Sequence, residues 1–210
     1  MTAPSPSPYR LSDKLITQGT REIKVILSNS TLRVCSFDEI NQPLVEKEMT
    51  QAFRQINHLL IKKYRKIIKD TYKSFGIILT SAEITAILAA IITSPDAVSG
   101  YIYKNEFPRK RERLVEGIVA RPKKQDIRNT VKKHLPYLLL MMAHYMDTLT
   151  VDSRLDAMKR NGVQEVIWVT EEDERVCETC KALEGQIFRI DSVPHIPQHY
   201  RCRCHVEPVR

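Results

Sequence analysis

Apolar residues recur every three or four positions along residues 44–75, with lysine and arginine between them. This spacing places the apolar side chains on one face and predicts a long amphipathic helix. The apolar stripe consists of Val45, Met49, Phe53, Ile56, Leu60, Tyr64, Ile67 and Phe75. Asn41 and Pro43 suit the start of this helix, and Gly76 suits a left-handed residue after its end.

A shorter helix, rich in alanine and isoleucine, is predicted from residue 81 to about residue 92, before Pro95. Thr80 and Glu83 have the spacing of a capping box, which marks its start. Its apolar composition predicts a buried helix. About a dozen residues are too few to cross a bilayer, which takes about twenty.

Further helices are predicted at residues 106–119, around 127–133 and at 137–160. Pro122 and Pro136 are the expected breaks between them. The last helix begins with the apolar run 138–142 and is predicted to be a core helix that leads into the C-terminal part. Charged residues and histidines on both sides of this run leave only about ten apolar residues together, too few for a membrane anchor.

Short β elements are predicted near both ends of the chain. Residues 22–27 and 32–37 alternate partially between apolar and polar types around Ser28-Asn29-Ser30, which makes an N-terminal β-hairpin plausible. Beyond Gly162, strands are predicted at residues 166–170, 186–190 and 205–209, with a turn at 171–173. Trp168 stands in the first of these strands and is expected to cover a small core rather than to stack on a nucleic-acid base.

The net charge of +8 favours polyanionic surroundings, such as DNA or an acidic protein ring. The basic residues form two main clusters, from which the candidate nucleic-acid contacts are Lys62, Lys63, Lys66, Arg109, Lys110 and Arg111. Charge runs of this kind are more often solvated helix faces. No motif that reads nucleic-acid sequence accompanies them, so the signal for DNA-backbone contact is weak.

Residues 177–180 and 199–205 gather four of the five cysteines and two of the six histidines. A Cys-x-x-Cys turn aims two thiolates into one small volume, and a His-x-x-Cys can complete the tetrahedron that structural zinc prefers. The expected Zn²⁺ ligands are Cys177, Cys180, His199 and Cys202, with Cys204 and His205 as alternates. Metal binding of this kind is worth about 10 kcal/mol or more, far above what roughly forty residues of apolar packing supply.

Two alternatives to a metal site remain open from the residues alone. The thiols could be reduced and hydrogen-bonded without metal, or they could pair as disulfides and leave Cys35 over. The first residues lack the apolar segment of a signal peptide, so reduced thiols are expected.

The predicted fold class is α+β, mainly α, because 210 residues can hold one compact domain and an appendage. Residues 1–10 are rich in proline and serine and are predicted to be a disordered tail. Residues 11–161 would form a mainly helical body that includes the N-terminal hairpin. Residues 162–210 would form a small β-rich zinc knuckle.

The residues around the metal ligands follow a specific order. It runs Trp168-Val169-Thr170, Asp173-Glu174-Arg175-Val176-Cys177, Cys180, Leu183-Glu184-Gly185, a loop with Pro194 and Pro197, then His199 and Cys202-Arg203-Cys204. This order resembles the C-terminal part of the phage Mu protein F-like head morphogenesis family, which reads W-x-T-x-x-D-x-R-x-C-x-x-C-x-x-L-x-G and ends in H-x-x-C-R-C. The resemblance covers roughly residues 162–209.

The resemblance implies a minor structural protein of a tailed-phage head that associates with the portal protein or the major capsid protein. It implies assembly in the host cytoplasm, a place in the virion head, and multiple copies in a symmetric assembly that contains packaged DNA. No enzymatic reaction is implied, and the chain has no His-Glu-x-x-His, no glycine-rich phosphate loop and no Gly-x-Ser-x-Gly. The alternative is a zinc-stabilised nucleic-acid-binding protein or nuclease.

Overall fold

The computed structural model describes residues 8–93, 105–170, 176–196, 198–199 and 202–209. The predicted disorder of residues 1–7 and the predicted turn at 171–173 lie outside these residues. Within the described parts the chain is mainly helical, with a small antiparallel sheet near its C-terminus. The predicted α+β, mainly α class is confirmed.

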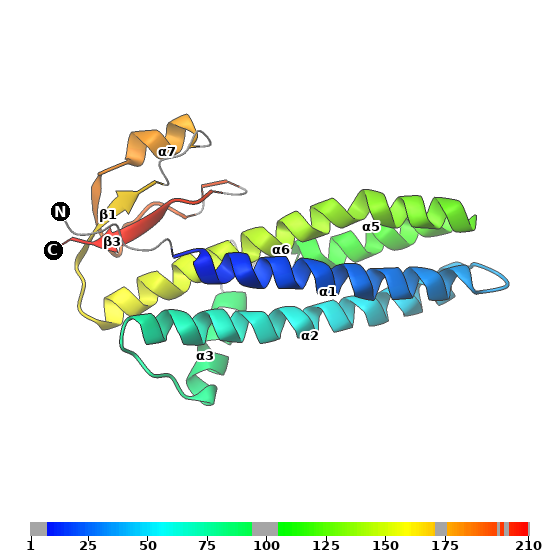
Figure 1. Ribbon diagram of the computed structural model, residues 1–210, viewed down its shortest axis with the longest axis horizontal. Helices are drawn as coiled ribbons and strands as arrows, with labels where there is room; N and C mark the ends of the chain where they lie inside the picture. Colours follow the sequence, from blue (N-terminus) through cyan, green and yellow to red (C-terminus); the bar gives the residue numbers. More distant parts are fainter. Residues whose placement is uncertain (1–7, 94–104, 171–175, 197, 200–201, 210) are drawn as a thin grey trace.

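An elongated helical bundle forms the body of the molecule (Figure 1). It consists of α1 (Arg10–Cys35), α2 (Gln42–Ser74), α5 (Phe107–Val119) and α6 (Lys124–Arg160). α1 and α5 each pack against both α2 and α6, and α2 and α6 also pack against each other. The turns from α1 to α2 and from α5 to α6 lie at one end of the bundle, and the sheet lies at the other end.

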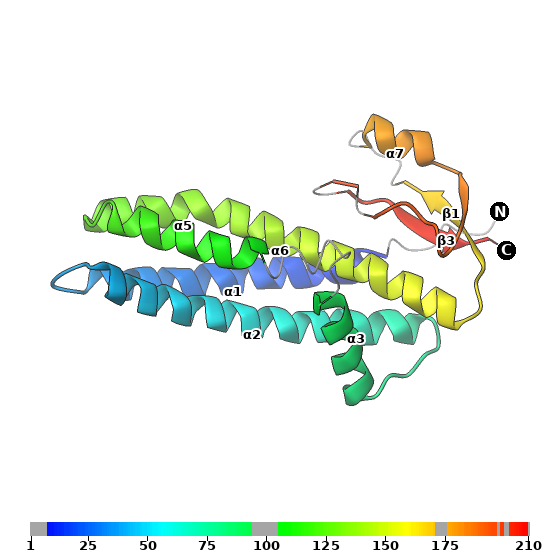
Figure 2. The same cartoon turned by 180° about the vertical axis from the view of Figure 1, so that it is seen from behind.

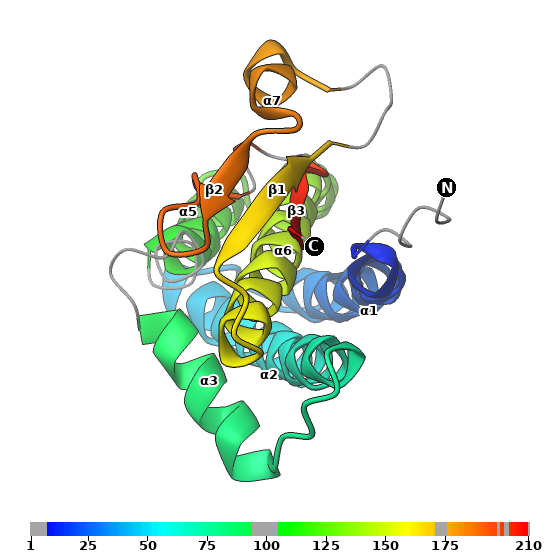
Figure 3. The ribbon, with the colours of Figure 1, turned by 90° about the vertical axis from the view of Figure 1, so that its left-hand side faces the viewer.

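The sheet has the order β2-β1-β3, and both pairings are antiparallel. Its strands are β1 (Glu165–Val169), β2 (Ile187–Arg189) and β3 (His205–Pro208). A short helix, α7 (Glu178–Leu183), separates β1 from β2 along the chain. Figures 1 and 3 show the sheet on the side of α6 that faces away from α2.

The predicted N-terminal hairpin is wrong, because residues 22–27 and 32–37 both lie in the single helix α1 or directly at its end. Ile23, Leu27 and Val34 follow the helical period and are buried in the bundle core. Thr31, close to the expected turn, donates its Oγ1 hydrogen bond to the carbonyl of Leu27 at 2.6 Å. Tertiary packing of the helical stripe therefore outweighs the partial alternation that suggested strands.

The predicted break at Pro136 is also wrong, because α6 continues through this residue. Proline inside a helix removes one backbone hydrogen bond and usually costs about 3 kcal/mol or more. Pro136 and Lys132, four residues earlier, are exposed, so water can hydrate this side of the helix. Val131 and Leu138 are buried in one bundle core on either side of Pro136, and this packing holds the two halves in one helix.

The predicted ends of α2 and the predicted start of the next helix are confirmed. Asn41 caps α2 by accepting a hydrogen bond from the N–H of Leu44 at 3.2 Å, and Gly76 has a φ of +77° after the helix. Thr80 and Glu83 form the capping box of α3 (Ser81–Thr93). The Glu83 carboxylate accepts from the Thr80 N–H at 2.7 Å, and Thr80 Oγ1 accepts from the Glu83 N–H at 3.2 Å.

The predicted burial of α3 is wrong for most of the helix. Only Ile84 and Leu88 of its described side chains are buried, whereas all of its alanines are exposed. α3 lies against α2 with one face and projects from the bundle (Figure 2). Its composition is apolar all round, but a single neighbouring helix covers a single face.

The second half of α6 is the most enclosed part of the fold. Every residue from 144 to 151 is buried. The bundle core covers one side of this segment, while Val151 and Met158 belong to the separate core beneath the sheet. Trp168 is fully buried in that second core beside the C-terminal cysteines, which confirms its predicted place.

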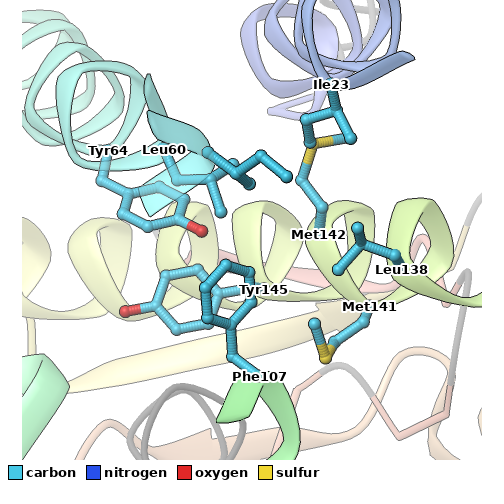
Figure 4. A pocket seen from close by; sticks show the side chains of 9 residues that line it. Ile23, Leu60, Tyr64, Phe107, Leu138, Met141, Met142 and Tyr145 are labelled. Carbon is cyan, nitrogen blue, oxygen red and sulfur yellow. The ribbon is translucent and has the colours of Figure 1, made fainter. Parts of the chain in front are cut away.

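A small gap remains in the bundle core, where side chains of all four bundle helices meet (Figure 4). It has a volume of about 10 Å³ and an apolar lining, which includes Tyr64 and Tyr145 with ring centroids 4.4 Å apart. This volume is about that of one water molecule, so the gap is a packing feature and not a ligand site. No described helix is both long and apolar enough to cross a membrane.

Replacing Tyr145 by alanine should lower the free energy of unfolding by about 3–5 kcal/mol, because it removes a fully packed aromatic ring. Tyr137→Ala is the matched control on the same helix, since the Tyr137 side chain is 48% exposed. It should cost less than about 1 kcal/mol. Urea denaturation followed by circular dichroism measures both values. Equal losses would contradict the described packing of α6.

Candidate metal centre

The sheet brings together the two segments that carry the cysteines. β1 pairs with β3 so that Val169, the last residue of β1, stands opposite His205, the first residue of β3. The chain that leaves β1 reaches Cys177, the N-cap residue of α7, and the chain that enters β3 carries Cys202 and Cys204. Residues that follow β1 and residues that precede β3 therefore meet at one edge of the sheet.

The donor atoms form two overlapping groups, each with all its atoms within 4.8 Å of one another. One group is Cys177, Cys180 and His199, and the other is Cys180, Cys202 and Cys204. Cys180 belongs to both groups. These groups could hold a metal ion.

The distances within the groups fit a tetrahedral site. Cys180 Sγ lies 3.7 Å from Cys202 Sγ and 3.7 Å from His199 Nε2. Zinc bonds of about 2.3 Å to sulfur and about 2.1 Å to nitrogen place tetrahedral ligands about 3.8 Å and about 3.6 Å apart, respectively. These two distances agree with the tetrahedral spacings to within about 0.1 Å.

The cysteines are free thiols, as predicted. A disulfide requires sulfur atoms about 2.05 Å apart, much closer than Cys180 and Cys202. Cys180, Cys202 and Cys204 are buried, Cys177 is half-buried, and His199 is exposed. The remaining cysteine, Cys35, lies in the bundle, where its Sγ is 3.8 Å from the carbonyl oxygen of Lys124.

Hydrogen bonds within the site favour two thiolates. The side chain of Cys204 is the main donor that lowers the pKa of Cys202 to about 5, and the backbone N–H groups of Cys204 and Gln198 add to the effect. The backbone N–H of Cys180 likewise lowers the pKa of Cys177. Burial raises the pKa of Cys180 to about 12. Since a metal binds the thiolate form, the site already stabilises part of the charge that coordination needs.

Two polar residues of α6 lie close to the donors. Burial raises the pKa of Asp147 to about 7, although the Ser12 hydroxyl donates to its Oδ1 at 3.0 Å and nearby Arg203 opposes the shift. Burial also lowers the pKa of His144 to about 4, and the neighbouring His195 and His199 add to this. Neither residue has a metal-ligand spacing in the sequence, so sequence reasoning did not single them out.

The start of α1 is attached directly to the cysteine segment. The Tyr9 hydroxyl donates to the Cys204 carbonyl, and the Arg203 guanidinium donates to both carboxylate oxygens of Asp13 at 2.6 and 2.9 Å. The Arg203 guanidinium also lies 4.6 Å from the centroid of the Tyr9 ring. We call these four residues, Tyr9, Asp13, Arg203 and Cys204, the N-terminal clamp.

The N-terminal clamp corrects the predicted tail at residues 1–10. Arg10 begins α1, and Tyr9 is fully buried in the core beneath the sheet. Its ring completes a core that the C-terminal residues do not fill by themselves. Burial raises the pKa of Tyr9, so its hydroxyl keeps the proton that it donates.

His205, the second predicted alternate ligand, belongs to neither donor group among the described residues. Its Nε2 lies 3.7 Å from Glu207, and its ring meets the Tyr9 ring edge-on with centroids 6.5 Å apart. Of the two alternates, Cys204 is therefore the one that the geometry favours.

The structure divides the predicted nucleic-acid contacts between two helices. On α2, Lys62 is exposed, but Lys63 is buried beside Gly19 and pairs with Glu22 at 2.6 Å. Lys66 pairs with Asp70 at 2.9 Å. Ion pairs therefore occupy two of the three predicted contacts on α2, and Lys62 remains exposed.

On α5, two of the three predicted contacts also have acidic neighbours. Arg109 lies 3.6 Å from Glu106, and Arg111 lies 3.9 Å from Glu112. Lys110 instead places its Nζ 3.4 Å from the centroid of the Tyr137 ring on α6. The predicted basic residues therefore do not form one continuous surface.

Residues 111–207 match the family described as phage Mu protein F like protein. Over these residues the chain is similar to that family. We call residues 111–207 the Mu F-like region. It contains most of α5, all of α6, the sheet except for Pro208, and every donor of the candidate metal centre. Comparison with curated proteins gives no match, and comparison with solved structures gives none either. The family implies a phage head-related protein.

Arg203→Ala should loosen the start of α1 against the Mu F-like region, because it removes both hydrogen bonds to Asp13. Amide hydrogen exchange of residues 9–15 should accelerate, and stability should fall by about 1 kcal/mol, since the pair is partly exposed. Arg160→Ala is the control, because it breaks an ion pair within α6, with Asp156, and leaves the N-terminal clamp intact. Unchanged exchange at residues 9–15 in Arg203→Ala would show that the clamp does not hold α1.

Proposed function

We propose that this protein is a minor structural protein of a tailed-phage head, which acts in head morphogenesis beside the portal protein or the major capsid protein. It would be assembled in the host cytoplasm and take its place in the virion head in multiple copies. The observation that supports this most is the Mu F-like match, which covers both the cysteine knuckle and the helix on which the knuckle rests.

The fold supports assembly rather than catalysis as its mechanism. The elongated bundle offers long helical surfaces for contacts with other head proteins, and the knuckle fixes the end of the bundle where α1 begins and β3 lies (Figure 1). A tetrahedral metal held by Cys177, Cys180, His199 and a further cysteine would have all four positions filled by protein donors, as in structural sites, whereas catalytic zinc keeps one position open for water.

The metal would be structural Zn²⁺. Cys177, Cys180 and His199 would supply three ligands, and Cys202 or Cys204 would supply the fourth. Cys202 is 3.7 Å from Cys180 and has the lowered thiol pKa, which favours it for the fourth position. The β-rich tail buries a small core, so metal binding would supply much of its stability.

Cys180→Ser should abolish zinc binding, because Cys180 is the donor that both groups share. Cys35→Ser is the matched control, since it removes a buried thiol from the bundle and leaves the knuckle unchanged. Elemental analysis of freshly reduced protein should find about one zinc per chain in the wild type and in Cys35→Ser. Retention of that zinc in Cys180→Ser, or its absence from folded wild-type protein, would contradict the proposed site.

The head assignment is tested by co-expressing the chain with the portal protein, and separately with the major capsid protein, of the same phage. The expected result is stoichiometric co-elution with at least one of them in size-exclusion chromatography. The same co-elution measured with Arg203→Ala shows whether the start of α1 contributes to the contact with the partner protein. A folded, zinc-loaded chain that stays separate from both partners would refute the assignment, and metal-dependent cleavage of DNA would favour a nuclease instead.

A further inference from the structure

A cluster of positive side chains lies where α5 crosses α6. α5 contributes Lys110 and Arg113, and α6 contributes Lys133 and His134, with the partly exposed Tyr137 beside them. Gly117 brings the two helices close together, because a Cβ at this position would lie 2.9 Å from Thr130 Cγ2. We call Lys110, Arg113, Lys133, His134 and Tyr137 the α5–α6 basic face.

These charges act on one another, and Glu106 only partly offsets them at Lys110. Among the described residues, no carboxylate lies within ion-pair distance of Lys110, Arg113 or Lys133. Burial lowers the pKa of Lys110, and the nearby Arg113 lowers it further. Burial likewise lowers the pKa of His134, to which Lys110, Lys133 and Arg113 all add. The cluster therefore carries mutual repulsion that is only partly offset in the free protein.

Helix stability does not account for this arrangement. The first turn of α5 contains no acidic residue and carries Arg109 and Lys110, although its N-cap residue is the acidic Glu106. Positive charge at a helix N-terminus opposes the helix dipole and usually costs a few tenths of a kcal/mol per residue. An external polyanion would relieve both the dipole interaction and the mutual repulsion.

We propose that the α5–α6 basic face binds the phosphate backbone of double-stranded nucleic acid. Arg113 and Lys133 are exposed, so their charged groups can reach phosphates directly. Contact with phosphates neutralises lysine and arginine and releases counterions, which drives binding without reading sequence. The Tyr137 hydroxyl adds a group of the kind that donates hydrogen bonds to phosphate oxygens.

The composition of the face favours a nucleic acid over an acidic protein. Protein interfaces usually have an apolar centre that is depleted of lysine. Among the described residues, the other large exposed apolar side chains lie elsewhere, at Val25, Leu32, Leu44, Ile78, Ile187 and Val209. The α5–α6 basic face offers cations, an imidazole and a phenol instead.

This surface replaces the α2 cluster as the binding site for nucleic acid. Lys63 is buried and ion-paired, and Lys66 has Asp70 as a neighbour. The inference rests on the α5–α6 contacts and charges and not on the head assignment. The result of the portal-binding experiment therefore does not decide it.

The test measures binding of the purified, zinc-loaded full-length chain to a fluorescein-labelled DNA duplex by anisotropy over a series of salt concentrations. The variant is Arg113→Gln combined with Lys133→Gln. Its affinity should fall at least about tenfold, and the slope of log affinity against log salt should shrink by about two, one for each phosphate that the variant no longer neutralises. The matched control, Lys62→Gln with Lys69→Gln, removes two exposed lysines of α2 and should change affinity less than about twofold.

A charge-preserving variant, Arg113→Lys with Lys133→Arg, should bind the duplex as the wild type does, and circular dichroism checks that every variant is folded. Equal losses of affinity in the test and control variants would show that binding depends only on the net charge of the protein, which would overturn the proposal. Unchanged duplex binding in Arg113→Gln with Lys133→Gln, together with abolished binding to polyglutamate, would overturn it in favour of an acidic protein partner.

Discussion

The second half of α6 is the support on which the rest of the structure depends. The sheet and the cysteine loops contain too few residues to bury a core by themselves. Their core is completed by side chains from the outer side of α6. The inner side of the same helix segment belongs to the bundle core. One helix therefore joins two small cores, and neither core is complete without it.

Burial on both sides of the helix explains the shifted pKa values of two residues in this segment. His144 and Asp147 are polar residues in a stretch where water reaches neither side of the helix. Desolvation is the main cause of the shifted pKa of each residue, and both shifts favour the neutral form. The hydrogen bond from the Ser12 hydroxyl partly offsets the rise in the pKa of Asp147. This bond also connects α1 to the segment. Polar contacts therefore add to apolar packing at the junction between knuckle and bundle.

Local signals in the sequence correctly predicted the structural features that depend on residues close together in the chain. The cap of α2 at Asn41, the capping box at Thr80 and the convergence of Cys177 and Cys180 follow from spacings of three residues. The failures involve distant partners. The packing of α1 against α2 and α6 decided its helical state, packing on both sides of Pro136 kept α6 whole, and a single neighbour left α3 exposed. The contact between Asp13 and Arg203 spans 190 positions, and no periodicity or motif encodes such a pair.

The tripeptide Cys202-Arg203-Cys204 links the candidate metal centre to the bundle. Its two cysteines point to the shared donor Cys180, while the arginine between them holds Asp13 and covers Tyr9. Alternate residues of an extended segment point to opposite sides, so the same backbone can serve both contacts. Fixing the two thiols fixes the backbone on either side of Arg203, and with it the Cys204 carbonyl that accepts from Tyr9. A metal bound by these cysteines would therefore also order the start of α1. The ordering of the N-terminal helix and that of the C-terminal knuckle are coupled through these contacts.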